Sequence, residues 1–125
     1  MSLLLDSHVL LWALHDTDRI SADALASIRD PRTAVFYSAA SVWELELKAA
    51  VGKLGLPEGW IDETGRAGFL ELPVTAADAR ASAHLPWHHR DPFDRVLVAQ
   101  AQRHALRIAT RDPLVSAYDV AVLAV

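Results

Sequence analysis

The stretch LLLDSHVLLWAL, residues 3–14, decides the fold class, because it joins two apolar segments through a short acidic turn. Residues 3–5 are expected to form a buried strand that ends at Asp6, and residues 9–14 are apolar enough to form a helix. Two further runs, AVFY at 34–37 and VAVLAV at 120–125, are almost continuously apolar. Such runs are typical of strands that are buried on both faces of a sheet.

Strand and helix patterns alternate along the rest of the chain, with short connections between them. Helix starts are indicated by Ser21, Thr75 and Asp91, and Ser41 with Glu44 has the spacing of a capping box. The expected strands are 3–5, 34–37, 69–72, 106–110 and 120–125, and the expected helices are 9–14, 22–30, 41–52, 58–66, 76–85 and 92–105. This alternation predicts an α/β fold in which helices cover a central parallel sheet of four or five strands.

Composition limits the classes of function. The 125 residues are expected to form a single domain, and the 52% of hydrophobic residues suffice for a core. The 12 basic against 16 acidic residues give a net charge of −4, which argues against a generic polyanion binder with a basic surface. The absence of cysteine excludes thiolate chemistry and favours an intracellular, cytoplasmic protein. No apolar run is long enough for a membrane span, and the first residues make a poor signal peptide.

Four acids occupy positions that a fold of this class brings to one rim. Asp6 and Asp112 follow the carboxyl ends of expected strands, where ligands bind in open α/β sheets. Glu44 and Asp94 lie in the expected first turns of helices, which face the same edge. Carboxylates that share a site repel one another unless a cation lies among them. Hard divalent ions prefer such oxygen ligands, so this pattern indicates Mg²⁺ or Mn²⁺ and attack of an activated water on a phosphodiester.

Each acid also has an ordinary structural explanation. Asp6 can cap a helix, Glu44 can be the capping-box partner of a serine, and Asp94 can interact with a helix dipole. Asp91 is most simply the N-cap of the helix that begins at residue 92. Asp112 can form the turn before a proline. The joint placement at two strand ends and two helix starts favours the functional interpretation.

With these residues identified, the sequence resembles the PIN-domain ribonuclease family, and within it the VapC-type toxins. The stretch LLLDSHVLLW (3–12) is similar to the first motif of the family, with Asp6 as a metal ligand and Ser7 as its hydroxyl neighbour. The stretch SAASVWELELKAAVGKL (38–54) is similar to the second motif, in which Glu44 takes the acidic position.

The second half of the chain resembles the other two motifs. In RDPFDRVLVAQA (90–101), Asp94 takes the acidic position, and the additional Asp91 fits a subgroup that has Asp-Pro-Phe-Asp. In RIATRDPLVSAYDV (107–120), Thr110 and Asp112 take the motif positions, although Leu114 stands where the family often has phenylalanine. All four motifs occur in order over nearly the whole chain.

The resemblance implies a three-layer α/β/α PIN fold and a single-strand-specific endoribonuclease that uses Mg²⁺ or Mn²⁺. It also implies a cognate VapB-like antitoxin and a homodimer. The implied metal and catalytic residues are Asp6, Glu44, Asp94 and Asp112, with Ser7, Asp91 and Thr110 in supporting positions. Residues expected to contact RNA are Lys48, Trp87, His88, Arg90, Arg95 and Arg111. The alternative for these charged residues is a solvated surface, and for Lys48 it is an ion pair with Glu44.

Three other functions remain open at this point. A non-catalytic PIN-like interaction module would share the fold, but the presence of all four acids argues against it. A phosphoacceptor domain would also use an aspartate at a strand end, but the lysine expected on a later strand has no counterpart here. A DNA-directed nuclease would use the same acids, because the motifs do not distinguish the sugar of the substrate.

Overall fold

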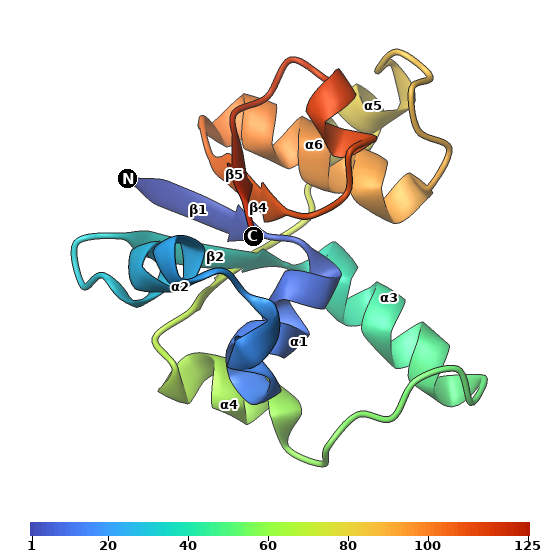
Figure 1. The fold of residues 1–125 in the computed structure, drawn as a ribbon. Coiled ribbons are helices and arrows are strands. Elements are labelled where there is room, and N and C mark those ends of the chain that lie inside the picture. The colour runs from blue at the N-terminus through green and yellow to red at the C-terminus, as the bar shows by residue number, and fades with distance from the viewer.

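A five-stranded parallel sheet forms the centre of the protein (Figure 1), as described by a computed structural model that covers residues 1–125. The strands are β1 (Ser2–Leu5), β2 (Ala34–Ser38), β3 (Leu70–Leu72), β4 (Arg107–Thr110) and β5 (Val122–Ala124). Their order across the sheet is β3-β2-β1-β4-β5, and every neighbouring pair is parallel. Residues that follow β1 therefore lie at the middle of the carboxyl edge of the sheet.

Helices cover both faces of this sheet. They are α1 (Ser7–His15), α2 (Ala22–Arg29), α3 (Ala39–Ala50), α4 (Trp60–Arg66), α5 (Ala76–Ala83) and α6 (Pro92–His104), with short 3-10 helices η1 (Thr17–Arg19) and η2 (Val115–Ala117). In Figure 1, α1, α2 and α4 lie on one side of the sheet, and α5 and α6 lie on the other. The predicted three-layer α/β/α fold is confirmed.

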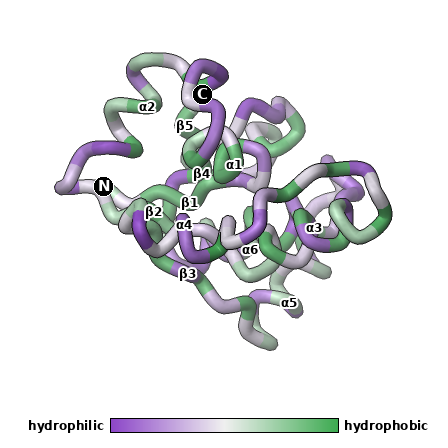
Figure 2. The backbone as a smooth tube through the Cα atoms, turned by 90° about the horizontal axis from the view of Figure 1, so that it is seen from below, coloured by the Kyte–Doolittle hydropathy of each residue, from purple (hydrophilic) through white to green (hydrophobic).

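The alternation of side chains along β1 creates the two cores. Leu3 and Leu5 pack with Val9 of α1 on one face, while Leu4 packs with Val98 of α6 on the other. All three leucines are completely buried, as expected for a central strand of a parallel sheet. The helices are amphipathic by contrast, and the tube through α3 alternates between hydrophobic and hydrophilic colours in Figure 2.

Most of the predicted helix starts are confirmed. Ser21 and Asp91 cap α2 and α6, and Thr75 forms a reciprocal capping box with Asp78 at α5. Asp6 also caps α1, because its Oδ1 accepts a hydrogen bond from the Val9 N–H at 2.8 Å. These caps fix where each helix leaves the sheet, and Asp6 and Asp91 thereby acquire both a structural role and a place at its carboxyl edge.

The predicted capping box at the start of α3 is wrong. Ser38, the last residue of β2, caps the helix instead, and its hydroxyl accepts from the Ala40 N–H at 3.0 Å. Ser41 thus lies inside the first turn of the helix, with a buried hydroxyl that has no partner. Glu44 accordingly lies in the second turn and not in the first, and the acid is free to face the neighbouring elements α1 and α6.

None of the helices has the length and the apolar character that crossing a membrane requires.

Candidate active site

A polar cavity of about 240 Å³ opens at the carboxyl edge of the sheet. No hydrophobic side chain lines it. The lining residues come from the segments that follow β1 and β4, from α1 and α3, and from the start of α6 with the loop before it. The lining residues are Asp6, Ser7, His8, Glu44, Lys48, His89, Asp91, Asp94 and Asp112. The structure therefore brings together the four acids that the motifs singled out, along with Ser7, Asp91 and Lys48.

Asp6 lies between β1 and β4, where it is largely buried. The residue is 9% exposed, and its Oδ2 accepts from the hydroxyl of Thr110 at 2.5 Å. The Thr110 hydroxyl oxygen in turn accepts from the Asp112 N–H at 3.0 Å. The hydroxyl of the fourth motif thus ties the acid of the first motif to the acid that follows β4.

Glu44 is held from two sides. Ser7 donates its hydroxyl to Oε1 at 2.6 Å, and the Lys48 ammonium lies 2.6 Å from Oε2. Glu44 is 4% exposed, so this charge is buried only because both oxygens are satisfied. Lys48 forms the intrahelical pair that was the alternative to RNA contact, and it still reaches the cavity wall.

Asp91 and Asp94 come from the first turn of α6. Asp91 Oδ1 accepts from the Phe93 and Asp94 N–H groups at 2.8 and 3.4 Å, which is the N-cap arrangement. Asp94 Oδ2 lies 2.9 Å from Nε2 of His89. The remaining oxygens, Asp91 Oδ2 and Asp94 Oδ1, make no hydrogen bond to the protein. They are the carboxylate atoms of the cavity that are most available to a ligand.

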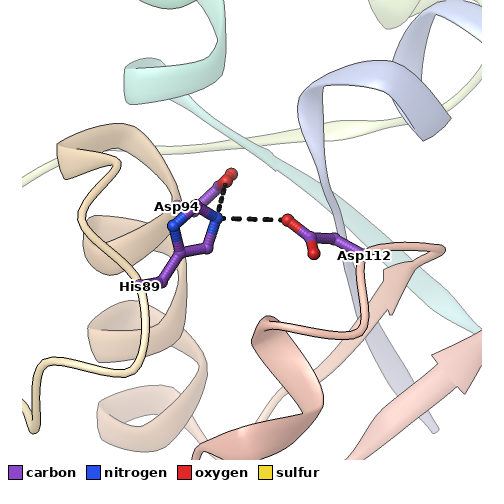
Figure 3. Close-up of side chains that lie close together, drawn as sticks. All are labelled: His89, Asp94 and Asp112. Carbon is purple, nitrogen blue, oxygen red and sulfur yellow. Dashed lines mark hydrogen bonds and ion pairs between the residues drawn. The ribbon is translucent and has the colours of Figure 1, made fainter.

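Asp112 reaches the same point from the loop that follows β4 (Figure 3). Its Oδ1 accepts from the Leu114 N–H at 2.9 Å, and its Oδ2 accepts from Nε2 of His89 at 3.1 Å. The ring nitrogen of His89 and one carboxylate oxygen each of Asp94 and Asp112 lie within 4.8 Å of one another. An imidazole thus lies where the acids of the third and fourth motifs meet.

The cavity is short of positive charge. Burial raises the pKa of Asp6 above its usual value, in spite of the hydrogen bonds from Thr110 and Val9. Burial, together with the negative charges of Asp91 and Glu44, raises the pKa of Asp94 to about 7. The hydrogen bond to Glu44 raises the pKa of Lys48, so this side chain stays cationic. One ammonium group does not neutralise five carboxylates, and a further cation would lower the free energy of the site.

Arg95 does not face the site, and its expected contact with RNA is not supported. The side chain is 3% exposed, and its guanidinium donates to the backbone carbonyls of Ser82, Leu85 and Pro86 at 2.7–3.0 Å. Arg95 therefore organises the loop between α5 and α6. Trp87 lies on the outside of that loop, 70% exposed, with its ring centroid 3.7 Å from the guanidinium carbon.

The other expected RNA contacts are divided between two places. Arg90 is exposed and shares a hollow of about 250 Å³ with Trp87. His88 is exposed and packs edge-on against Tyr118. The guanidinium of Arg111 lies over the Trp12 ring of α1 and donates to the carbonyls of Arg19 in η1 and of Val125 after β5. Arg111 therefore lies outside the cavity, and its contact with RNA stays a prediction.

Two cavity residues, His8 and His89, were not among the predicted site residues. His8 follows the Asp6-Ser7 pair at the start of α1, and nothing in the pattern distinguishes it from a surface histidine. His89 had a readable signal, because it precedes the N-cap Asp91 by two residues. At that spacing a side-chain acceptor can take the N–H of the capping residue, as the Asp91 N–H to His89 Nδ1 contact of 3.2 Å shows.

A family comparison identifies this architecture. The model of the PIN domain family matches residues 3–121, which is nearly the whole chain. The chain belongs to the PIN domain family. This membership confirms the resemblance that the four motifs indicated. PIN domains are typically nucleases, so the acidic cavity is the candidate active site of this PIN domain.

Solved structures share the fold of this chain. A chain of VapBC2 from Rickettsia felis, bound to a DNA fragment from the promoter, is similar with a TM-score of 0.72 at 11% identity, over 98% of both chains. A chain of FitAcB from Neisseria gonorrhoeae has a TM-score of 0.64 at 25% identity, over 98% of this chain and 96% of its own. FitAB bound to an IR36 DNA fragment has a TM-score of 0.63 at 22% identity, with 97% and 93% covered. No curated protein matches the sequence.

The donor set of this PIN domain suits a divalent cation. Carboxylate oxygens without a protein partner are present on Asp91 and Asp94, and five carboxylates line a cavity whose one lysine is already paired with Glu44. With no cysteine in the chain and oxygen as the main donor, hard ions such as Mg²⁺ and Mn²⁺ fit better than Zn²⁺.

Proposed function

We propose that this PIN domain is a single-strand-specific endoribonuclease that depends on Mg²⁺ or Mn²⁺, and that residues 1–125 act as one domain in the cytoplasm as the toxin of a toxin–antitoxin pair. The observation that carries the proposal is the convergence of Asp6, Glu44, Asp94 and Asp112 in one polar cavity. These acids come from four separated parts of the chain. Helix capping alone does not require these four acids to lie in one cavity.

The environment of each acid suggests how it would act. Asp94 would hold the cation directly through its free Oδ1. Asp6, which lies at the centre of the carboxyl edge of the sheet, would also hold it directly. Glu44 is already paired with Ser7 and Lys48, which favours contact through water. Asp112, on the loop that follows β4, is also proposed to act through water, with His89 and the Leu114 N–H holding its carboxylate. A cation bound here would activate water for attack on a phosphodiester and stabilise charge on the leaving oxygen.

Four side chains are proposed to hold the RNA. Lys48 lies at the cavity wall, where its ammonium can contact a phosphate beside the cleaved bond. Arg90 and Trp87 line a separate hollow on the loop before α6, and His88 directly precedes the cavity residue His89 on the same loop. An exposed tryptophan on a rigid support is suited to stacking on an unpaired base, which favours single strands.

The proposed partners are a cognate VapB-like antitoxin and a second copy of this chain. The antitoxin is supported by the resemblance to VapC-type toxins and by the similarity to chains of VapBC2 and FitAB. The second copy is supported by an exposed apolar stripe on α3, at Trp43, Leu47 and Val51. The spacing of four residues places these side chains on one face of the helix.

Cleavage assays with purified protein test the enzyme. Wild-type protein should cut a labelled single-stranded RNA in Mg²⁺ or Mn²⁺ and not in EDTA, and a duplex or single-stranded DNA of the same sequence should be cut poorly. Asp94→Asn should lower the rate by about 100-fold or more, because the acid with a free oxygen is lost. Asp119→Asn is the matched control, since this exposed acid lies at the opposite edge of the sheet. Full activity of Asp94→Asn would contradict the proposal.

Growth of cells tests the toxin assignment. Expression of the wild-type chain should arrest growth, and Asp6→Asn should relieve the arrest, because Asp6 anchors the centre of the site. The variant must accumulate to the same level as the wild type, which an immunoblot establishes. Arrest by Asp6→Asn at equal protein level would mean that toxicity does not come from this site.

A further inference from the structure

His89 is the one cavity residue that contacts two of the four motif acids at once. Its Nε2 donates to Asp112 Oδ2 at 3.1 Å and lies 2.9 Å from Asp94 Oδ2 (Figure 3). None of the four motifs includes it. The ring is largely buried, with 14% of the side chain exposed, so its place between the acids is set by packing and not by chance contact at the surface.

The backbone determines which ring nitrogen carries the proton. The Asp91 N–H points at Nδ1 from 3.2 Å, and an N–H can donate only to a nitrogen that has a free lone pair. Nδ1 is therefore unprotonated, and the ring hydrogen lies on Nε2, between the two carboxylates. An unprotonated Nε2 would instead place its lone pair against two carboxylate oxygens, which would repel it. The same Nε2–H has no lone pair to offer a metal ion, although the distances alone would allow His89 to be a ligand.

We propose that His89 is a positioning residue for the metal site: its Nε2–H holds the Asp112 carboxylate beside Asp94, and the imidazole is not itself a metal ligand. Asp112 is the more exposed of the two acids that His89 contacts, with 34% of its side chain accessible against 21% for Asp94. Without a donor between them, these two carboxylates repel, and Asp112 can turn toward water. A metal ion would then have to draw the Asp112 carboxylate back into the cavity, and the affinity for the metal would fall.

The contact of His89 with both acids also explains why a histidine is used at this position instead of a lysine or arginine. A permanent cation at this point would compete with a metal ion for the same oxygens. A single ring N–H orients the carboxylates and leaves their other lone pairs available to a cation. Outer hydrogen-bond partners of metal ligands generally have this task, and their loss costs about 10–100-fold in metal affinity or activity.

Metal titration of three variants tests the proposal, which rests on the metal site of the proposed function but needs no cleavage. His89→Ala should weaken Mn²⁺ binding by about tenfold or more in calorimetry. His89→Gln should stay within about threefold of the wild type, because its amide nitrogen can take the position of Nε2. His89→Asn is the matched control, since its shorter amide reproduces Nδ1 and cannot reach Asp112. Circular dichroism confirms that each variant is folded.

Nitrogen NMR of the wild-type imidazoles provides a second readout, which reports the position of the ring proton directly. The Nε2–H form of His89 should be present in EDTA and should persist in saturating Mg²⁺, with the signal assigned by its loss in His89→Gln. A shift of the proton to Nδ1 in Mg²⁺ would show direct ligation and overturn the proposal. Unchanged Mn²⁺ affinity of His89→Ala would also overturn it. If these results hold and no RNA is cut, the proposed function fails and the role of His89 stands.

Discussion

At the scale of single residues, Asp94 shows how the site stores unfavourable energy. It lies in the first turn of α6, close enough to Asp91 and Glu44 for their negative charges to act on it. Burial and these two charges raise the pKa of its carboxyl group to about 7. The folded protein therefore resists ionisation of Asp94 at the pH where the unfolded chain, with an ordinary aspartate pKa near 3.8, is already charged.

This difference predicts how stability depends on pH when no cation is present. Between about pH 4 and 7 the folded state holds a proton that the unfolded state has lost, so stability falls as the pH rises through this window. Asp94→Asn removes the penalty. In EDTA at pH 8, the variant should melt at least about 3 °C above the wild type, and at pH 4.5 the two should be nearly equal. Thermal melts that showed Asp94→Asn less stable at pH 8 would contradict this.

At the scale of elements, the loop between α5 and α6 differs most from expectation. The sequence placed this loop between the expected helices 76–85 and 92–105, and Arg95 was expected to contact RNA. The structure instead folds the loop around Arg95, whose guanidinium binds carbonyls at the end of α5 and in the loop itself. Spacing along the chain cannot reveal this, because the partners are backbone atoms that any sequence carries. The result is a rigid loop with Trp87 outside and His89 inside.

The rigid loop predicts a specific kinetic effect for Trp87. Stacking of one base on an aromatic ring contributes about 1–3 kcal/mol, so Trp87→Ala should raise the KM for single-stranded RNA about tenfold. The kcat should change less than about twofold, since the stack is equally strong before and during the reaction. Trp87→Phe should restore most of the affinity. Ile61→Ala, an exposed apolar residue of α4, is the control. An unchanged KM in Trp87→Ala would contradict the stacking of a base on this tryptophan.

At the scale of the whole molecule, the sheet and its two helical layers were predictable because hydrophobic periodicity reports them directly. Leu3–Leu5 followed by Asp6 is sufficient to expect a buried strand whose carboxyl end carries an acid. The start of α3 was not predictable in the same way. Ser38 and Ser41 both have the chemistry of a cap, and the choice of Ser38 depends on where β2 ends in the sheet. Local propensity left this open, and tertiary contacts decided it.

The exposed stripe of α3 leads to the last prediction, which concerns assembly. Trp43, Leu47 and Val51 leave a row of apolar surface in contact with water, and burying it against a second copy would remove an unfavourable exposure. Wild-type protein should sediment at twice the chain mass of 13.7 kDa, and Leu47→Glu should sediment as the monomer with unchanged secondary structure. Leu70→Glu is the matched control, because Leu70 is also 48% exposed but lies on the edge strand β3. Equal dissociation by both variants, or a monomeric wild type, would show that the stripe is not a surface of self-association.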